Sequence, residues 1–123
     1  MSGVDQVWKV VATRLADKDI LGIIAFIGER EGPDVAEAIL EKLIQARDSL
    51  SKLPDRGRIP PEMKRISVLS YREIQAAPYR IVYQVNKAAH TVYIHMVADG
   101  RRNMAALLKE RLLNAALSEI TKQ

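Results

Sequence analysis

Apolar residues recur at every third or fourth position in two neighbouring stretches of the chain, and this spacing predicts two amphipathic helices. Asp17 or Asp19 could cap the first helix, whose apolar positions are Ile20, Ile23, Ile24 and Ile27. Pro33 suits the first turn of the second helix, whose apolar positions are Ala36, Ile39, Leu40, Leu43, Ile44 and Leu50. Because only Gly32-Pro33 separates the two stretches, we expect an antiparallel helical hairpin.

Stretches rich in β-branched and aromatic residues predict strands. They are Val7–Thr13, Ile66–Gln75, Tyr79–Asn86 and Thr91–Ala98. Short connections separate the last three, which favours an antiparallel meander. Before them, Leu53–Pro61 contains three prolines and a glycine, so it cannot continue a helix and we expect a surface loop.

A helical pattern returns at Met104, with apolar positions at Leu107, Leu108, Leu112, Ala115 and Ile120. The expected order is therefore β-α-α-β-β-β-α, an α+β fold. A helical hairpin packed on one face of a small antiparallel sheet would bury the apolar stripes of both helices and leave the other sheet face partly open. We expect residues 1–123 to form a single domain, with 104–123 as a C-terminal helical extension.

Composition narrows the class of protein. At 123 residues and 48% hydrophobic, the chain suits one globular core. It has no cysteine and only two histidines, so we expect no disulfide, no metal site and no cofactor. The first residues lack the features of a secretory signal, and the longest apolar stretch is far too short to cross a bilayer. We therefore expect a cytoplasmic protein without a membrane partner.

Charge is unevenly distributed along the chain. Residues 1–53 hold seven Lys/Arg against nine Asp/Glu, whereas residues 54–102 hold nine against four. A basic second half favours an acidic partner, either nucleic acid or an acidic protein segment.

Arginines lie at the ends of the predicted strands or between their apolar residues, at Arg72, Arg80, Arg101 and Arg102. Guanidinium groups stay charged and match carboxylates and phosphates, so we expect these four to bind the target. Arg101-Arg102 would follow the last strand at the start of the last helix, where the helix dipole disfavours cations, and this placement indicates a function. Arg80 has a structural alternative, because a two-residue turn at Ala76-Ala77 would place it opposite Glu73 as a cross-strand ion pair.

Three motifs occur in order in the second half: Tyr71-Arg72-Glu73, then Tyr79-Arg80-Ile81-Val82-Tyr83, then Gly100-Arg101-Arg102. Together with Pro33-x-x-Ala36 and Leu50-x-x-Leu53-Pro54-x-x-Gly57-Arg58, their order and spacing resemble the ParE/RelE family of type II toxins, which includes plasmid stabilisation proteins. The resemblance covers roughly Val7 to Leu108.

That resemblance implies one fold with two activities. RelE-like members cleave messenger RNA in the ribosome, whereas ParE-like members inhibit DNA gyrase by binding it. RelE-like proteins carry lysines in the strand before the Tyr-Arg motif and a tyrosine in the C-terminal helix, and this chain has neither. A ParE-like gyrase inhibitor that is not an enzyme is therefore the better match. It implies a cognate ParD-like antitoxin, which we expect to cover Ile24, Ile27, Leu40 and Leu43.

Two alternatives stay open. A ribosome-dependent mRNA endonuclease would need an acid, a base and cations, and the candidates are Glu73, Arg80, His95 and Arg101. Glu73 and His95 are the only acid–base candidates on the strands, although a structural role is the commoner one for each. The other alternative is a basic nucleic-acid-binding module without toxicity.

Overall fold

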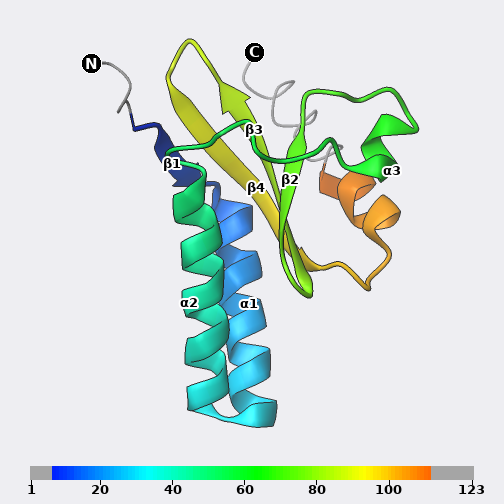
Figure 1. The fold of residues 1–123 in the computed structure, drawn as a ribbon. Coiled ribbons are helices and arrows are strands. Elements are labelled where there is room, and N and C mark those ends of the chain that lie inside the picture. Colours follow the sequence, from blue (N-terminus) through cyan, green and yellow to red (C-terminus); the bar gives the residue numbers. More distant parts are fainter. Residues whose placement is uncertain (1–6, 112–123) are drawn as a thin grey trace.

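The computed structural model describes residues 7–111, which form a four-stranded sheet with a helical hairpin on one face (Figure 1). The elements are β1 (Lys9–Ala12), α1 (Arg14–Glu31), α2 (Pro33–Ser49), α3 (Pro61–Lys64), β2 (Arg72–Ala76), β3 (Tyr79–Asn86) and β4 (Thr91–Asp99). Residues 104–111 are helical and end the described part. The α+β class and the predicted order are confirmed, with the short α3 as an addition.

The sheet has the strand order β1-β4-β3-β2. Strands β2, β3 and β4 form the predicted antiparallel meander. However, β1 pairs with β4 in parallel, from Lys9 opposite Thr91 to Ala12 opposite Ile94. The sheet is therefore mixed, and the expectation of a purely antiparallel sheet is wrong for β1. Since β1 ends opposite Ile94, it leaves the last residues of β4 without a neighbouring strand on that side.

The hairpin begins earlier than the sequence pattern predicts. Thr13 caps α1, because its hydroxyl oxygen accepts a hydrogen bond from the Ala16 amide at 3.2 Å. The prediction of a cap at Asp17 or Asp19 is thus wrong, and both residues lie inside the helix. The break at Gly32-Pro33 is confirmed: Gly32 has φ of 96°, which glycine adopts readily, and Pro33 begins α2.

The segment between the hairpin and the meander also differs from the prediction. The strand expected over Ile66–Gln75 begins only at Arg72, because α3 ends in a turn in which the Val68 amide donates to the Met63 carbonyl at 2.9 Å. The loop predicted at Leu53–Pro61 is present, yet parts of it are buried. The Tyr83 hydroxyl holds it by donating to the Pro54 carbonyl at 2.7 Å.

Apolar residues pack on both faces of the sheet. On the hairpin face, Leu43 and Leu50 of the α2 region contact residues such as Ile81 and Tyr83. On the second face, Met63 of α3 and the helix of residues 104–111 pack on Val82 and Met96. α3 and the C-terminal helix therefore cover one part of the second face, whereas Gln84 and Tyr93 on the other part are only half-buried, as expected for a partly open face.

The C-terminal helix begins at Met104, as the pattern predicts. Its further apolar positions, Leu112, Ala115 and Ile120, lie outside the described residues. Among residues 7–111, no helix combines the length and the apolar character needed to cross a membrane.

Candidate functional site

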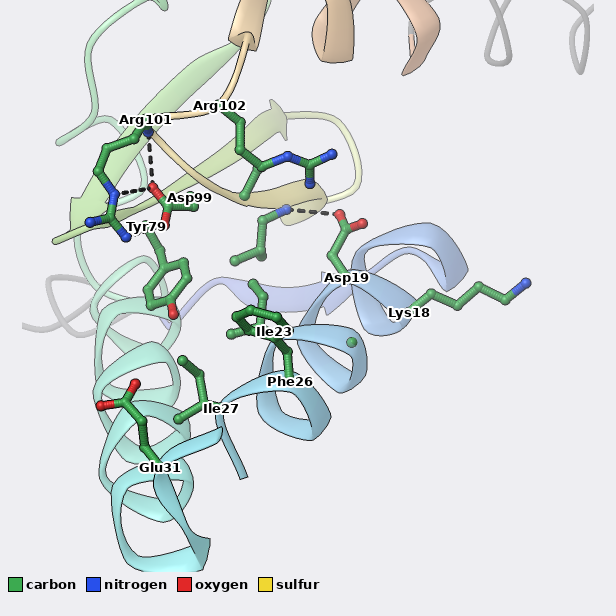
Figure 2. Close-up of a pocket in the computed structure, with 13 residues that line it drawn as sticks. Lys18, Asp19, Ile23, Phe26, Ile27, Glu31, Tyr79, Asp99, Arg101 and Arg102 are labelled. Atoms are coloured by element: carbon green, nitrogen blue, oxygen red, sulfur yellow. Dashed lines mark hydrogen bonds and ion pairs between the residues drawn. The ribbon is translucent and has the colours of Figure 1, made fainter. Parts of the chain in front are cut away.

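A groove of about 600 Å³ lies between α1 and the C-terminal end of β4 (Figure 2). It is lined by Lys18, Asp19, Gly22, Ile23, Phe26, Ile27 and Glu31 of α1, Tyr79 of β3, Val97, Ala98 and Asp99 of β4, and Arg101 and Arg102. Figure 2 shows the two arginines at one end of the groove and Glu31 at the other. The groove thus combines apolar walls from α1 with a basic end.

The apolar part of the groove is partly open to solvent. Phe26 is 57% exposed, and the Arg30 guanidinium lies 5.1 Å from the centre of its ring. Tyr79 is buried, and this burial, followed by the charge of Asp99, raises the pKa of its hydroxyl. An exposed phenylalanine beside a recess is a typical contact for a protein partner, because aromatic side chains lose little entropy when they are covered.

Arginines 101 and 102 differ in their bonding. Arg101 forms a bidentate pair with Asp99, with Nε to Oδ1 at 2.9 Å and Nη2 to Oδ2 at 2.5 Å. The hydrogen bond from Arg101 lowers the pKa of Asp99 to about 2, so this carboxylate stays charged. Arg102 and Lys18 have no ion-pair partner within residues 7–111, so both can contact a ligand without breaking an existing pair.

The free edge of β4 is closed by one ion pair. The Val97 amide donates to Asp19 Oδ2 at 2.9 Å, which satisfies a backbone group that β1 is too short to reach. Arg111 binds Asp19 at 3.0 Å and also donates to the His95 carbonyl. Asp19 and Arg111 therefore cover this strand edge beside the groove and anchor the C-terminal helix.

Arg80 lies in a buried network of ion pairs on the second face of the sheet. Its Nε donates to Glu73 Oε1 at 2.7 Å, and its two terminal nitrogens bind Glu62 of α3 at 2.9 and 2.7 Å. Arg58 completes the network through Glu73 Oε2 at 2.8 Å. Arg80 is 8% exposed and Glu73 is 2% exposed. The hydrogen bond from Arg80 lowers the pKa of Glu62 to about 2, and the same bond raises the pKa of Arg80.

The predicted Glu73–Arg80 ion pair is confirmed, although the predicted turn is wrong. Gln75 lies opposite Arg80 and Ala76 opposite Tyr79, so the turn is Ala77-Pro78 and Glu73 is a diagonal neighbour of Arg80. Because the shift moves the pairing by two positions, both side chains remain on the same face of the sheet. Arg80 therefore has a structural role, with both carboxylates already bound to it.

Arg72 and His95, the other predicted site residues on the strands, also form contacts within the fold. Arg72 donates to the Gly57 carbonyl at 2.8 Å and thereby holds the loop before α3. His95 shares a hydrogen bond of 2.9 Å with the Gln84 side chain, and its ring meets that of Tyr71 edge to face. Burial, followed by the charge of Arg111, lowers the pKa of His95, which keeps the ring neutral at pH 7.

The structure brings two of the four arginines together. Arg101 and Arg102 share the groove, whereas Arg80 lies in the buried network and Arg72 lies against the loop. The backbone of Gly100 passes close to the Arg80 side chain and so connects the groove with the buried network: a Cβ on Gly100 would lie 2.9 Å from Cδ of Arg80. Glycine is thus required where the chain turns toward Arg101.

The four residues expected to contact an antitoxin differ in how accessible they are to a partner. Ile27 lines the groove. Ile24 and Leu40 are half-buried, and Leu43 is 3% exposed within the hairpin-face core. Of the four, Ile27 is therefore the best placed for a partner, and Leu43 is the least accessible.

Sequence reasoning did not identify Phe26, Tyr79 or Asp99 as parts of one groove. Phe26 is the only phenylalanine in the chain, and it lies off the isoleucine stripe of α1. That position is the one signal that could have marked it as an exposed contact. In the described part of the chain, no three His, Asp or Glu side chains come together as metal ligands would.

Comparisons with known proteins identify relatives. A family model described as the ParE toxin of the type II toxin-antitoxin system parDE matches residues 10–104. Toxin ParE3 of Caulobacter vibrioides is 27% identical over 103 residues, which are 84% of this chain and 97% of that toxin. A chain of the chromosomal ParDE system from P. aeruginosa has a TM-score of 0.63 at 16% identity, over 77% of this chain and 98% of its own. A chain of the toxin-antitoxin complex RelBE2 from Mycobacterium tuberculosis has a TM-score of 0.52 at 21% identity, over 77% and 93%.

Proposed function

Since the chain belongs to the ParE family of toxins of type II toxin-antitoxin systems, we propose that it arrests bacterial growth by binding DNA gyrase through the groove and its arginine end. The observation that carries this proposal is that the predicted arginines lie in different environments. The pair that is exposed lies at a groove with apolar walls, and Arg80, which could serve catalysis, is locked between two carboxylates.

The bonding of the acid–base candidates supports binding over RNA cleavage. Cleavage by a 2′-hydroxyl needs a free base, a free acid and cations around the phosphate. Glu73 is buried between Arg58 and Arg80, so both of its carboxylate oxygens are already bound and are shielded from a substrate. His95 is hydrogen-bonded to Gln84, and α3 and the C-terminal helix cover the part of the sheet face on which Arg80 lies. A ribosome-dependent nuclease is therefore the alternative to gyrase binding, and an assay for cleavage of ribosome-bound message tests it.

Neutralisation by a cognate antitoxin is the second part of the proposal. The groove offers apolar contacts at Phe26 and Ile27, and cations at Arg102 and Lys18. It is matched by a short segment with apolar residues and carboxylates, the chemistry of an acidic, partly disordered ParD-like antitoxin. We place toxin and antitoxin in the cytoplasm, where gyrase acts.

Assays with purified protein distinguish gyrase from ribosome-bound messenger RNA as the target. We expect it to inhibit supercoiling of relaxed plasmid by gyrase and to leave messenger RNA on ribosomes intact. Expression of the chain alone should arrest growth, and co-expression of the antitoxin should restore it.

Cleavage of ribosome-bound message, lost in His95→Ala or Glu73→Gln variants that still fold, would replace gyrase inhibition with nuclease activity. Normal growth with abundant folded protein, together with salt-sensitive binding to bare nucleic acid, would instead support a non-toxic nucleic-acid-binding module.

A further inference from the structure

One face of α1 is exposed along most of the helix, and its residues Lys18, Gly22 and Phe26 border the groove. Leu21 is 68% exposed and Phe26 is 57% exposed, which is unusual for two large apolar residues on one helix face. The helical hairpin extends beyond the end of the sheet, so no other described element covers this part of α1 (Figure 1). Figure 2 shows that Lys18 also extends away from the sheet.

The order of residues on this face is self-complementary. Its members follow helical spacing, and all are exposed: Lys18, Leu21, Gly22, Ala25, Phe26 and Glu29. If a second α1 lies antiparallel across the first, with the two-fold axis between Gly22 and Ala25, Lys18 of each copy meets Glu29 of the other. The same symmetry places the small residues at the crossing, where the backbones come closest.

Charge supports this pairing. Lys18 and Glu29 have no ion-pair partner among residues 7–111, so neither has to leave an existing bond. A two-fold contact would form the Lys18–Glu29 pair twice, once at each end of the apolar patch. A partner of different sequence would match this face only if it carried an acidic residue opposite Lys18 and a basic residue opposite Glu29, an order that a second copy supplies by symmetry.

We propose that the exposed face of α1 is a homodimer interface, in which two copies pack antiparallel with Leu21 and Phe26 covered and Lys18 paired with Glu29 of the second copy. A contact limited to one helix per copy is smaller than the roughly 800 Å² per partner of a standard interface, so the dimer is weak and reversible. Lys18, Gly22 and Phe26 also line the groove, so a dimer and a ligand in the groove exclude each other.

Charge-reversal variants of the full chain, studied by sedimentation velocity, test the proposal. Sedimentation velocity over about 10 to 500 µM covers the range expected for a contact of this size. We expect wild-type protein to dimerise with increasing concentration. Lys18→Glu alone and Glu29→Lys alone should each weaken the dimer by about tenfold or more, because like charges then meet at both ends. An equimolar mixture of the two variants should restore it, because opposite charges meet again at both ends.

Two further variants separate the interface from the fold. A Cβ on Gly22 meets no atom within 4 Å, so Gly22→Gln fits the monomer while obstructing the helix crossing. Glu37→Lys reverses an exposed charge on α2 and should leave the dimer unchanged. A protein that stays monomeric throughout the range, or a dimer that persists in both charge variants, would overturn the proposal. So would a mixture that fails to restore the dimer, which would indicate that the face binds a different partner.

Discussion

Replacement of Arg80 by alanine tests whether this arginine stabilises the fold or binds the target. In the folded protein, Arg80 is 8% exposed and binds the carboxylates of Glu73 and Glu62. Arg80→Ala leaves Glu73 with Arg58 alone and leaves Glu62 without its partner. It also removes the methylenes that pack beneath Gly100.

Two arguments give the size of the effect. Arg80 is the main cause that holds the pKa of Glu62 at about 2 rather than 4.5, which corresponds to about 3 kcal/mol at neutral pH. Loss of one partner from a buried pair generally costs about 3–5 kcal/mol. Because Glu73 retains Arg58, we expect a value near the lower end, about 3 kcal/mol. That is a large part of the roughly 5–15 kcal/mol by which domains of this size are stable.

Urea unfolding at pH 7 measures this loss. With a slope of about 2 kcal/mol per molar urea, Arg80→Ala should lower the unfolding midpoint by about 1.5 M. The double variant Glu73→Gln/Arg80→Met is the control, since it leaves no unpaired charge at Glu73 and should be less destabilised than Arg80→Ala. If Arg80→Ala unfolds at the wild-type midpoint and yet loses toxicity, the structural account of Arg80 is refuted and its role lies at the target.

Three further results are expected from the same structure. Because the pKa of Glu62 is depressed, this residue contributes to the free energy of unfolding above pH 4.5, and the contribution is lost as the pH falls toward 2. Urea unfolding across this pH range should therefore show a steeper loss of stability in wild type than in Arg80→Ala. Parallel curves for the two proteins would count against the Glu62–Arg80 bond. Tyr83→Phe should cost about 1–3 kcal/mol in urea unfolding, because the buried hydroxyl serves both the Pro54 carbonyl and the Gly57 amide, and an unchanged midpoint would show that these bonds do not hold the loop. Asp19→Ala should speed hydrogen exchange at the Val97 amide by about tenfold or more, with the Val92 amide as an internal control, and equal protection of Val97 would disprove the capping of this strand edge.

The regular parts of the fold could be predicted because their signals are local. The isoleucine stripe and Gly32-Pro33 define the hairpin, and β-branched runs define the meander. The start of α1 cannot be read from its local sequence, because Thr13 and Asp17 are both good capping residues and the choice between them depends on where β1 ends. The composition around Ile66 favours a strand, but the turn after α3 occupies those residues instead, and β2 begins at Arg72.

The site was harder to predict because it depends on pairings between distant residues. The sequence shows that Glu73 and Arg80 can meet, and they do. It gives no sign that Glu62 joins them from α3, or that Asp19 binds Arg111 and the Val97 amide. These contacts decide which charges are free, and they join residues that are 18 to 92 positions apart.

The most direct test of the central claim, that the toxin acts by binding through the arginine end of the groove, is gyrase supercoiling in the presence of Arg101→Ala/Arg102→Ala. Both arginines are exposed, so the variant should keep the stability of wild type within about 0.5 kcal/mol. Lys52→Ala/Lys87→Ala removes two exposed charges elsewhere and serves as the matched control. We expect the control to inhibit gyrase as wild type does, and the arginine variant to lose inhibition. A folded arginine variant that inhibits gyrase at the wild-type concentration would contradict the claim.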